Sequence, residues 1–238
     1  MIEKAMILAA GFGKRLNPLT LTCPKPLLRI GHVTLLSNTL NFLEKFGIKE
    51  VVINVHYLGN QVIDYIKKKN FNTRIHIIEE KEKILNTGGG ILNAIDFFKK
   101  DSFLTINPDT LWSLNHIKEL ELMDKNFERN KKNKCSILVV NKEKSFDKSF
   151  KGDFNLKNNL ITKNNKEELN YIYTGLQIIK PEAFSQISKK VFSLNEIWDN
   201  LIRQNELLGI ESKADFFHVS TLSVYNRLLE NENLNNFF

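Results

Sequence analysis

Short apolar segments rich in β-branched residues alternate, along the first half of the chain, with segments whose hydrophobic residues recur at helical spacing. The apolar segments have the length of strands, and the others place their hydrophobic residues on one face of a helix. Strands and helices in alternation favour right-handed crossovers and a mainly parallel sheet with helices on both faces. The pattern predicts strands at 4–10, 50–55, 73–79 and 102–106 and helices at 34–46, 59–69 and 91–100.

The second half of the chain follows a less regular pattern of the same two kinds of element. No linker, internal repeat or shift of composition separates the halves, so we expect one α/β domain over residues 1–238, with Lys- and Asn-rich insertions around a single sheet. Gly175 interrupts one strand in this half. The strands expected here are 135–141, 171–179, 207–211 and 216–219, with a hairpin at 154–162, and the helices are 115–127, 194–204 and 222–230.

Composition and charge exclude several functional classes. With 42% hydrophobic and 26% charged residues, the sequence is typical of a soluble globular protein, and no stretch approaches the roughly 18 apolar residues of a membrane span. The net charge of +7 suits small anionic substrates. A nucleic-acid surface is the weaker interpretation, because the Lys-rich loops carry no interleaved aromatic residues. Two distant cysteines, Cys23 and Cys135, form no metal-binding pair, and together with the lack of a signal peptide they predict a reducing cytoplasm.

A loop with two glycines and a cluster of cations follows the first strand. Gly11 and Gly13 would let backbone N–H groups approach a ligand without an intervening Cβ. Lys14 and Arg15 stand directly after them, and Lys25 lies between two prolines. Cations beside such a loop suit a polyphosphate. A turn with solvated charges is the alternative, but a surface loop has no need for the fixed backbone that two prolines give Lys25.

The spacing of this loop differs from two common phosphate-binding motifs. A dinucleotide fingerprint has a third glycine where this chain has Leu16. A P-loop has four residues between its glycines, whereas only Phe12 separates Gly11 from Gly13. The loop is therefore predicted to bind phosphate in a third manner.

Two further features fall at the ends of predicted strands, where ligands bind in open parallel sheets. Asp109 follows the strand at 102–106, and a carboxylate there can hold Mg²⁺ against a triphosphate. A helix N-cap or turn residue is the alternative. Thr87 and the glycines 88–90 precede the helix at 91–100. They could cap that helix, but three glycines exceed what a cap requires, and a nucleobase lying against bare backbone would explain them.

These features match a known signature. The segment after the first strand, with Pro18, Thr20 and residues 24–27, resembles the signature of sugar-1-phosphate nucleotidyltransferases. The resemblance extends over nearly the whole chain. Further segments are similar to the branch that includes N-acetylmuramate 1-phosphate uridylyltransferase, with short mannose-1-phosphate guanylyltransferase-like proteins close by. The signature segment is Ile7-Leu8-Ala9-Ala10-Gly11-Phe12-Gly13-Lys14-Arg15-Leu16, and the further segments are 54–58, 86–91, 107–112, 151–154 and 173–177.

The resemblance implies a Rossmann-like nucleotidyltransferase fold and a reaction of an NTP with a sugar 1-phosphate that gives an NDP-sugar and pyrophosphate, with Mg²⁺ as cofactor. A sugar phosphate is already an oxyanion near pH 7, so catalysis rests on positioning and charge neutralisation rather than on a general base. By resemblance, Arg15, Lys25 and Asp109 are the catalytic residues, and Asp109 holds the metal. The nucleotide-binding residues would be Ala9, Ala10, Gly11, Gly13, Lys14, Thr87 and Gly88, and the sugar-phosphate-binding residues Asn107, Gly175 and His218.

The chain departs from the family pattern in residues 216–221. Many members carry a second metal-binding Asp there, in a Trp-x-Asp-hydrophobic-Gly-Thr pattern, whereas this chain has His218 at the Asp position and Ser220 at the Gly position. Imidazole is a poor Mg²⁺ ligand beside carboxylate. We expect that Asp109 and phosphate oxygens suffice for the metal or that His218 contacts phosphate. Use of Mn²⁺ and loss of activity are the alternatives.

Three functions remain compatible with the sequence. The best supported is a cytoplasmic uridylyltransferase of N-acetylmuramate 1-phosphate in cell-wall sugar recycling, and GTP with mannose 1-phosphate is the alternative within the class. A non-catalytic regulatory subunit is favoured only by His218 and is disfavoured by the presence of Arg15, Lys25 and Asp109 together. No hexapeptide repeat indicates a C-terminal β-helix. We expect a monomer or small homo-oligomer without nucleic-acid or membrane partners.

Overall fold

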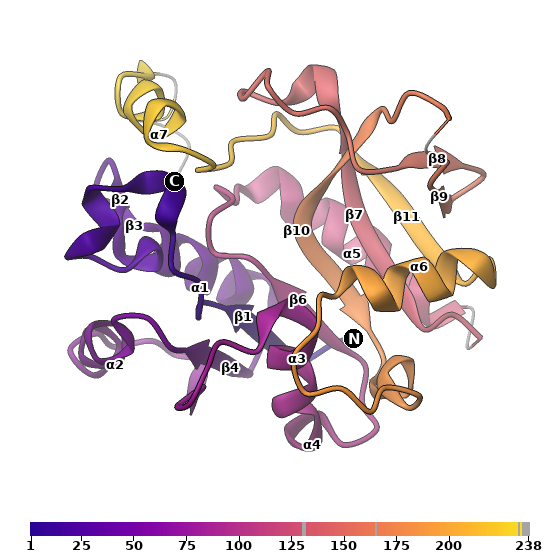
Figure 1. Cartoon of the computed structure of the whole chain (residues 1–238), viewed down its shortest axis with the longest axis horizontal. Helices are drawn as coiled ribbons and strands as arrows, with labels where there is room; N and C mark the ends of the chain where they lie inside the picture. Colours follow the sequence, from indigo (N-terminus) through magenta and orange to yellow (C-terminus); the bar gives the residue numbers. More distant parts are fainter. Residues whose placement is uncertain (130–131, 165, 233, 235–238) are drawn as a thin grey trace.

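A nine-stranded sheet organises the part of the chain that the computed structural model describes, residues 1–129, 132–164, 166–232 and 234. The strand order across it is β5-β4-β1-β6-β10-β7-β11-β9-β8 (Figure 1). A separate ribbon pairs β2 (Arg29–Ile30) with β3 (Val33–Thr34). The strands of the large sheet are β1 (Lys4–Leu8), β4 (Glu50–Val55), β5 (Arg74–Glu79), β6 (Phe103–Ile106), β7 (Cys135–Asn141), β8 (Asn155–Lys157), β9 (Leu160–Thr162), β10 (Tyr171–Ile179) and β11 (Leu207–Ser212).

The sheet divides into a parallel half and a mixed half. In the first, β4 and β6 flank β1 in parallel, and β5 extends the sheet beyond β4. In the second, β10 runs antiparallel to both β6 and β7, and β11 runs parallel to β7. This arrangement confirms the mixed, mainly parallel sheet that the sequence predicts.

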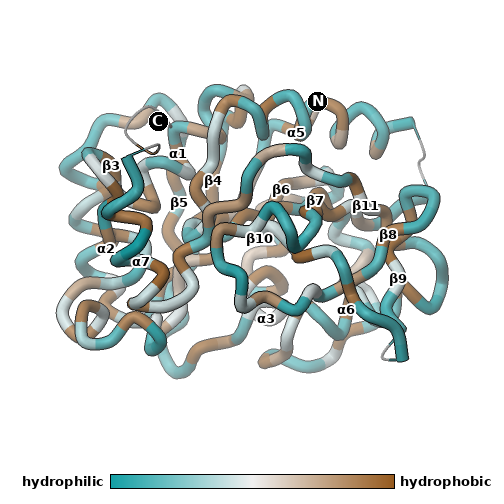
Figure 2. The backbone as a smooth tube through the Cα atoms, turned by 90° about the horizontal axis from the view of Figure 1, so that it is seen from above, coloured by the Kyte–Doolittle hydropathy of each residue, from teal (hydrophilic) through white to brown (hydrophobic). Residues whose placement is uncertain are grey.

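Helices cover both faces of the sheet, and the side-chain alternation of β1 explains why. Ala5 and Ile7 are fully buried with α1, α2 and α5, whereas Met6 points to the opposite face and packs with α3, α4 and α6. Side chains of successive strand residues point to opposite faces, so an all-apolar strand needs a helical layer on each side. Figure 2 shows the hydrophobic residues gathered in the central strands. The helices are α1 (Leu35–Phe46), α2 (Gly59–Lys67), α3 (Asn86–Asn93), α4 (Ile95–Phe98), α5 (Leu114–Arg129), α6 (Asn195–Arg203) and α7 (Leu222–Leu229).

The glycine run lies inside a helix rather than before one. The predicted helix 91–100 in fact starts at Asn86 as α3 and is broken at Ala94 before α4. Gly88 and Gly89 each donate a backbone N–H to the carbonyl of Phe192, both at 3.1 Å. A Cβ on Gly89 would lie 2.3 Å from the carbonyl oxygen of Lys190. The run therefore allows α3 to pack against the segment before α6, and the expected contact of a nucleobase with this run stays a prediction.

Replacing Gly89 with alanine should therefore destabilise the fold although alanine is the better helix former. The clash with the Lys190 carbonyl forces α3 and the neighbouring segment apart, and overpacking of this kind costs about 1–3 kcal/mol. Urea unfolding followed by circular dichroism measures the loss. Gly11→Ala is the matched control, since a Cβ there meets no atom within 4 Å; equal stability of the two variants would contradict the packing role.

The chain returns from the mixed half to the parallel half along residues 213–221, here called the C-terminal strap. Figure 1 shows it leaving β11, crossing the top of the view and reaching α7 beside the indigo N-terminal elements. The predicted strand 216–219 is wrong: Phe216 and His218 make only isolated bridges, to Ser145 and Thr110. Beyond the strap, α7 packs its buried side chains against Leu16 and other residues of the loop after β1.

Within the described ranges, no helix combines the length and apolar composition needed to cross a bilayer.

Candidate active site

A cleft of about 390 Å³ opens at the carboxyl ends of β1 and β6. The loop after β1, the start of α3 and the residues that follow β6 line it, which is where ligands bind in open α/β sheets. The sequence-predicted residues that it brings together are Ala9, Ala10, Gly11, Gly13, Lys14, Arg15, Lys25, Thr87, Asn107 and Asp109. Leu8, Asn54, Glu80, Asn86, Pro108 and Ser220 also line it, as do several other apolar residues.

The glycine loop presents backbone to this cleft. Gly13 adopts a left-handed conformation with φ 65° and ψ 22° and directly precedes a single 3₁₀ turn, Lys14–Leu16. The hydroxyl of Thr20 donates to the carbonyl of Gly13 at 3.0 Å and fixes the turn. Gly11 is exposed, and a Cβ on it would meet no protein atom within 4 Å. Packing therefore explains Gly13 but not Gly11, whose lack of a side chain leaves room for a ligand.

Gly11→Ala should consequently leave the fold intact and weaken NTP binding. The added methyl group enters only the space beside the loop backbone, where a phosphate would approach the N–H groups. We expect a loss of affinity of about tenfold, or about 1.4 kcal/mol, measured by calorimetric titration with NTP. Unchanged affinity in a stable variant would show that phosphate does not bind at this backbone.

Lys25 and Asp109 form an ion pair within the cleft. The Lys25 ammonium contacts Oδ2 of Asp109, and the two side chains are 14% and 19% exposed. Lys25 opens the 3₁₀ turn Lys25–Leu27, where Pro24 and Pro26 fix the backbone on either side, as the sequence suggests. Burial would raise the pKa of Asp109, but the charge of His218 when protonated and the charge and hydrogen bond of Lys25 hold it at about 2. Asp109 is thus a carboxylate at neutral pH.

Asp109 also has one carboxylate oxygen that could bind a metal ion. Its Oδ1 is buried and has no hydrogen-bond partner, whereas Oδ2 is occupied by Lys25. Among the described residues, no group of three or more His, Cys, Asp and Glu side chains could hold a metal. Mg²⁺ is commonly bound by one or two carboxylates, with phosphate oxygens and water completing its shell. The donor set fits that pattern and not a cage made of protein ligands.

His218 lies beside this pair and is neutral there. Its Nδ1 is 3.6 Å from Oδ1 of Asp109 and 3.3 Å from Oγ1 of Thr110. Burial, with the charges of Lys25 and Arg15, lowers the pKa of His218 to about 4, and the Asp109 carboxylate only partly opposes them. The ring stacks on Phe216, with 5.7 Å between centroids. At neutral pH the C-terminal strap therefore contributes no charge through His218.

The end of the cleft beside α3 is fixed by a buried network that sequence spacing did not reveal. Asn54, at the end of β4, accepts the N–H of Ala9 at 2.9 Å and donates to Oε1 of Glu80 at 2.7 Å. Oε2 of Glu80 accepts the N–H of Leu85 at 2.7 Å, and Glu80 is only 4% exposed. Glu80 thus ties the end of β1 and the loop before α3 together.

Thr87 and Gly88 occupy different positions at this end. Thr87 lines the cleft, and its hydroxyl accepts the N–H of Leu194 at 2.9 Å. Gly88 is buried, and a Cβ on it would lie 2.3 Å from the ring of Phe192. Gly88 thus allows α3 to pack closely against the segment before α6. Its predicted contact with the base stays a prediction.

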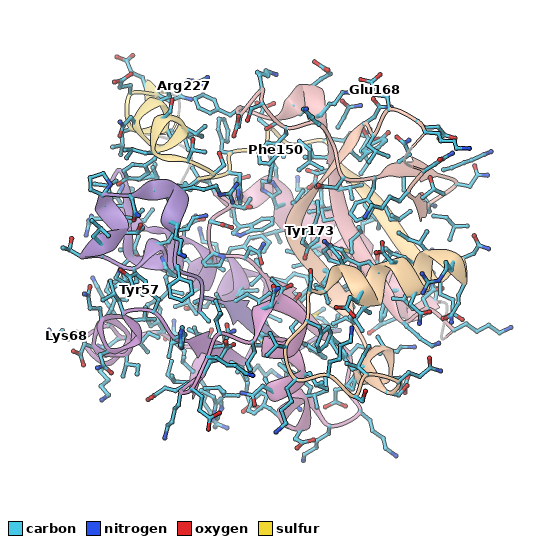
Figure 3. The ribbon with its side chains drawn as sticks, in the orientation of Figure 1. Tyr57, Lys68, Phe150, Glu168, Tyr173 and Arg227 are labelled. Atoms are coloured by element: carbon cyan, nitrogen blue, oxygen red, sulfur yellow. The ribbon has the colours of Figure 1, made fainter. Side chains whose placement is uncertain are left out.

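Asn107 and Gly175, which the sequence predicts to bind the sugar phosphate, meet where β6 ends beside β10. The N–H of Asn107 donates to the carbonyl of Gly175 at 2.8 Å. Gly175 has φ 96° and sits in a bulge between Tyr173 and Gln177. A Cβ on it would lie 2.9 Å from Cβ of Asn107, so this glycine in a strand pattern marks a close approach of two chains. In Figure 3, Tyr173 and Phe150 lie toward the middle of the molecule, whereas Lys68 and Glu168 lie at its rim.

Comparison with known proteins finds relatives that match most of the chain. The two curated relatives described here are both named N-acetylmuramate alpha-1-phosphate uridylyltransferase. That of Caulobacter vibrioides is 28% identical over 220 residues, covering 90% of each chain. That of Neisseria meningitidis serogroup B is 31% identical over 225 residues, covering 92% of this chain and 94% of the relative. The crystal structure of HddC from Yersinia pseudotuberculosis shares the fold, with a TM-score of 0.74 and 23% identity over 96% of this chain and 99% of that one.

The profile of the Nucleotidyl transferase family matches residues 4–201. That range contains the glycine loop, Lys25, Asp109 and Gly175, but it ends before the C-terminal strap. The family expected from the sequence is therefore confirmed, and so is the enzyme class. The chain belongs to the nucleotidyl transferase family and is a nucleotidyltransferase.

Proposed function

We propose that this nucleotidyltransferase transfers a uridylyl group from UTP to N-acetylmuramate 1-phosphate, giving UDP-N-acetylmuramate and pyrophosphate. One observation above all supports the reaction class: the partly buried Lys25–Asp109 pair lies in the same cleft as the glycine loop and Arg15. The choice of nucleotide and sugar is supported by the two uridylyltransferases that match the chain over 90% or more of their length.

In this proposal, different groups of the cleft neutralise the charge of different phosphates of the NTP. The backbone N–H groups of the glycine loop and the Arg15 guanidinium would hold the β- and γ-phosphates. Lys25 would neutralise charge on the α-phosphate while a sugar-phosphate oxygen attacks the α-phosphorus. The bond between the α-phosphorus and the bridging oxygen to the β-phosphate then breaks, and pyrophosphate leaves. Mg²⁺, when bound to Asp109, would neutralise further phosphate charge, and Mn²⁺ could serve in its place.

The remaining cleft residues would position the two substrates. Thr87, at the start of α3, lies where the uracil would bind, and the Asn54–Glu80 network holds that end in place. Asn107, held against Gly175, would contact the sugar phosphate. Positioning of this kind is a large part of catalysis when the nucleophile is already ionised.

A pyrophosphate-release assay tests the proposal. Four NTPs are crossed with the 1-phosphates of N-acetylmuramate, N-acetylglucosamine, mannose and glucose, in the presence of Mg²⁺. We expect the highest kcat/KM for UTP with N-acetylmuramate 1-phosphate. Fastest turnover of GTP with mannose 1-phosphate would instead select guanylyl transfer. No release from any pair, with tight NTP binding retained, would select a regulatory nucleotide-binding subunit.

His218→Ala should weaken but not abolish turnover in that assay. The imidazole is neutral at pH 7 and touches Thr110 and the aromatic rings around it, so its removal disturbs packing beside Asp109 without removing a charge. We expect kcat to fall by roughly tenfold or less, which corresponds to one lost neutral hydrogen bond. A fall of a thousandfold would mean that the imidazole itself acts on the reacting groups.

We also infer a cytoplasmic location. Cys23 and Cys135 are both free thiols, and burial raises the pKa of each, that of Cys135 most strongly. Free structural thiols suit a reducing compartment, which is also where the proposed NTP substrate is available. Fractionation of the source cells with an activity assay checks the location.

A further inference from the structure

Three segments that are far apart in the sequence lie side by side at one end of the cleft. On one side of the C-terminal strap, the N–H of Val219 donates to the carbonyl of Asp109 at 2.8 Å. On its other side, the N–H of Phe146 donates to the Phe216 carbonyl at 2.9 Å, and the N–H of Phe216 donates to the Lys144 carbonyl at 3.0 Å. The strap therefore lies between the segment that carries Asp109 and the segment that carries Asp147.

A hydrogen bond connects the strap to Asp147. The hydroxyl of Ser220 donates to Oδ2 of Asp147 at 2.5 Å, and the two residues are 3% and 5% exposed. Ser149 donates both its N–H and its hydroxyl to the other carboxylate oxygen, at 3.0 and 2.6 Å. Burial would raise the pKa of Asp147, but the bonds from Ser149 and Ser220 hold it below the ordinary value. Asp147 is thus an ionised acceptor with fixed donors on both oxygens.

The direction of this bond determines what Ser220 can do in the cleft. A carboxylate only accepts, so the single proton of the Ser220 hydroxyl must point to Asp147. The lone pairs of Ser220 Oγ then remain available to accept a hydrogen bond or to bind a cation. The negative charge of the Asp147 carboxylate makes this oxygen a stronger acceptor. Ser220 lines the same cleft as Asp109, whose Oδ1 is buried and has no hydrogen-bond partner.

We propose that Ser220, its proton held by Asp147, is an oxygen acceptor that positions a hydrated divalent cation beside Asp109. Asp147 is then a positioning residue that acts through Ser220 without touching the ion. One carboxylate and one polarised hydroxyl, with phosphate oxygens and water, form a plausible donor set for Mg²⁺ or Mn²⁺. The proposal rests on the proposed function in so far as that function brings a metal–nucleotide complex into the cleft.

The test measures metal binding rather than turnover. Free Mn²⁺ is followed by electron paramagnetic resonance in titrations of the full chain with a UTP analogue that carries a non-hydrolysable α,β-bridge. Ser220→Ala and Asp147→Asn should each weaken Mn²⁺ affinity roughly tenfold, the lower end of what loss of a supporting partner costs a metal site. The double variant should be no weaker than either single variant, because both act through one oxygen.

Ser149→Ala is the matched control, because it removes a hydrogen bond from Asp147 but leaves the bond from Ser220. It should retain Mn²⁺ affinity within about twofold, a difference of some 0.4 kcal/mol. Thermal unfolding of each variant checks the fold, and Ser220→Ala, which removes a single oxygen atom, covers the case in which Asp147→Asn does not fold.

Two results would overturn the proposal. One is wild-type Mn²⁺ affinity in folded Ser220→Ala. The other is an equal loss of UTP-analogue affinity with and without metal, which would indicate a purely structural bond. Failure of the proposed reaction would look different: no sugar phosphate would support pyrophosphate release, while the shift in Mn²⁺ affinity would persist.

Discussion

Asp109→Ala should slow pyrophosphate release at least about 100-fold, the scale on which removal of one charge-stabilising group affects catalysis. Asp109 is the cleft carboxylate that combines an ion pair with Lys25 and a buried oxygen without a partner. Its loss therefore removes the proposed metal ligand and leaves the Lys25 ammonium without its carboxylate partner. The measurement is a coupled pyrophosphate assay at saturating substrates over a range of Mg²⁺ concentrations.

The range of Mg²⁺ concentrations distinguishes the two roles of Asp109. If Asp109 holds the ion, Asp109→Asn, which keeps the shape but loses the charge, should need more Mg²⁺ to reach its own maximal rate. Asp101→Asn is the control, since Asp101 pairs with Lys4 and its side chain is 65% exposed. An Asp109→Ala enzyme as fast as wild type would remove both the metal assignment and the catalytic one.

Lys25→Met should reduce both stability and turnover, and a second substitution should separate the two. Without Lys25 the Asp109 carboxylate is buried next to a neutral His218 and has lost its counter-ion. Breaking a partly buried pair in this way should cost up to about 3 kcal/mol, the lower end of the range for fully buried pairs, which urea unfolding would show. We expect turnover to fall at least about 100-fold, because charge on the α-phosphate is no longer neutralised.

The double variant Lys25→Met/Asp109→Asn removes both charges and should recover most of the lost stability, since neutral replacement of a buried pair is often tolerated. It should recover none of the activity. Lys4→Met is the matched control, because its partner Asp101 is exposed and such surface pairs contribute less than about 1 kcal/mol. If the double variant were as unstable as Lys25→Met, the loss would come from packing of the lysine stem and not from the unpaired charge.

The sheet could be predicted from the sequence because each of its longer strands has a local pattern of apolar residues. The strands Glu50–Val55, Cys135–Asn141 and Tyr171–Ile179 have the predicted bounds, since runs of β-branched apolar residues bounded by polar ones leave little choice. The prediction of a strand at 216–219, within the C-terminal strap, is wrong for the opposite reason. It has the composition of a strand, but its neighbours offer only single bridges, and pairing depends on tertiary position.

The same distinction between local and tertiary information applies to the residues of the site. Gly11, Arg15, Lys25 and Asp109 could be predicted because glycine, proline and charge in a short segment each have a local physical meaning. The roles of Glu80 and Asp147 could not, because a lone acidic residue in sequence gives no sign of being buried. Their partners are Asn54 and Ser220, and only the folded chain brings these pairs together.

The C-terminal strap also has a consequence for the order in which the molecule is made. A ribosome delivers the chain from its N-terminal end, so the glycine loop, β1 and Asp109 are synthesised long before Val219, which hydrogen-bonds to Asp109. Until then the growing polypeptide has its glycine loop but lacks the hydrogen bond from Val219 to Asp109, and α7 does not yet cover that loop. A chain released before the strap therefore lacks both the backbone hydrogen bond to Asp109 and the helix that packs on the glycine loop.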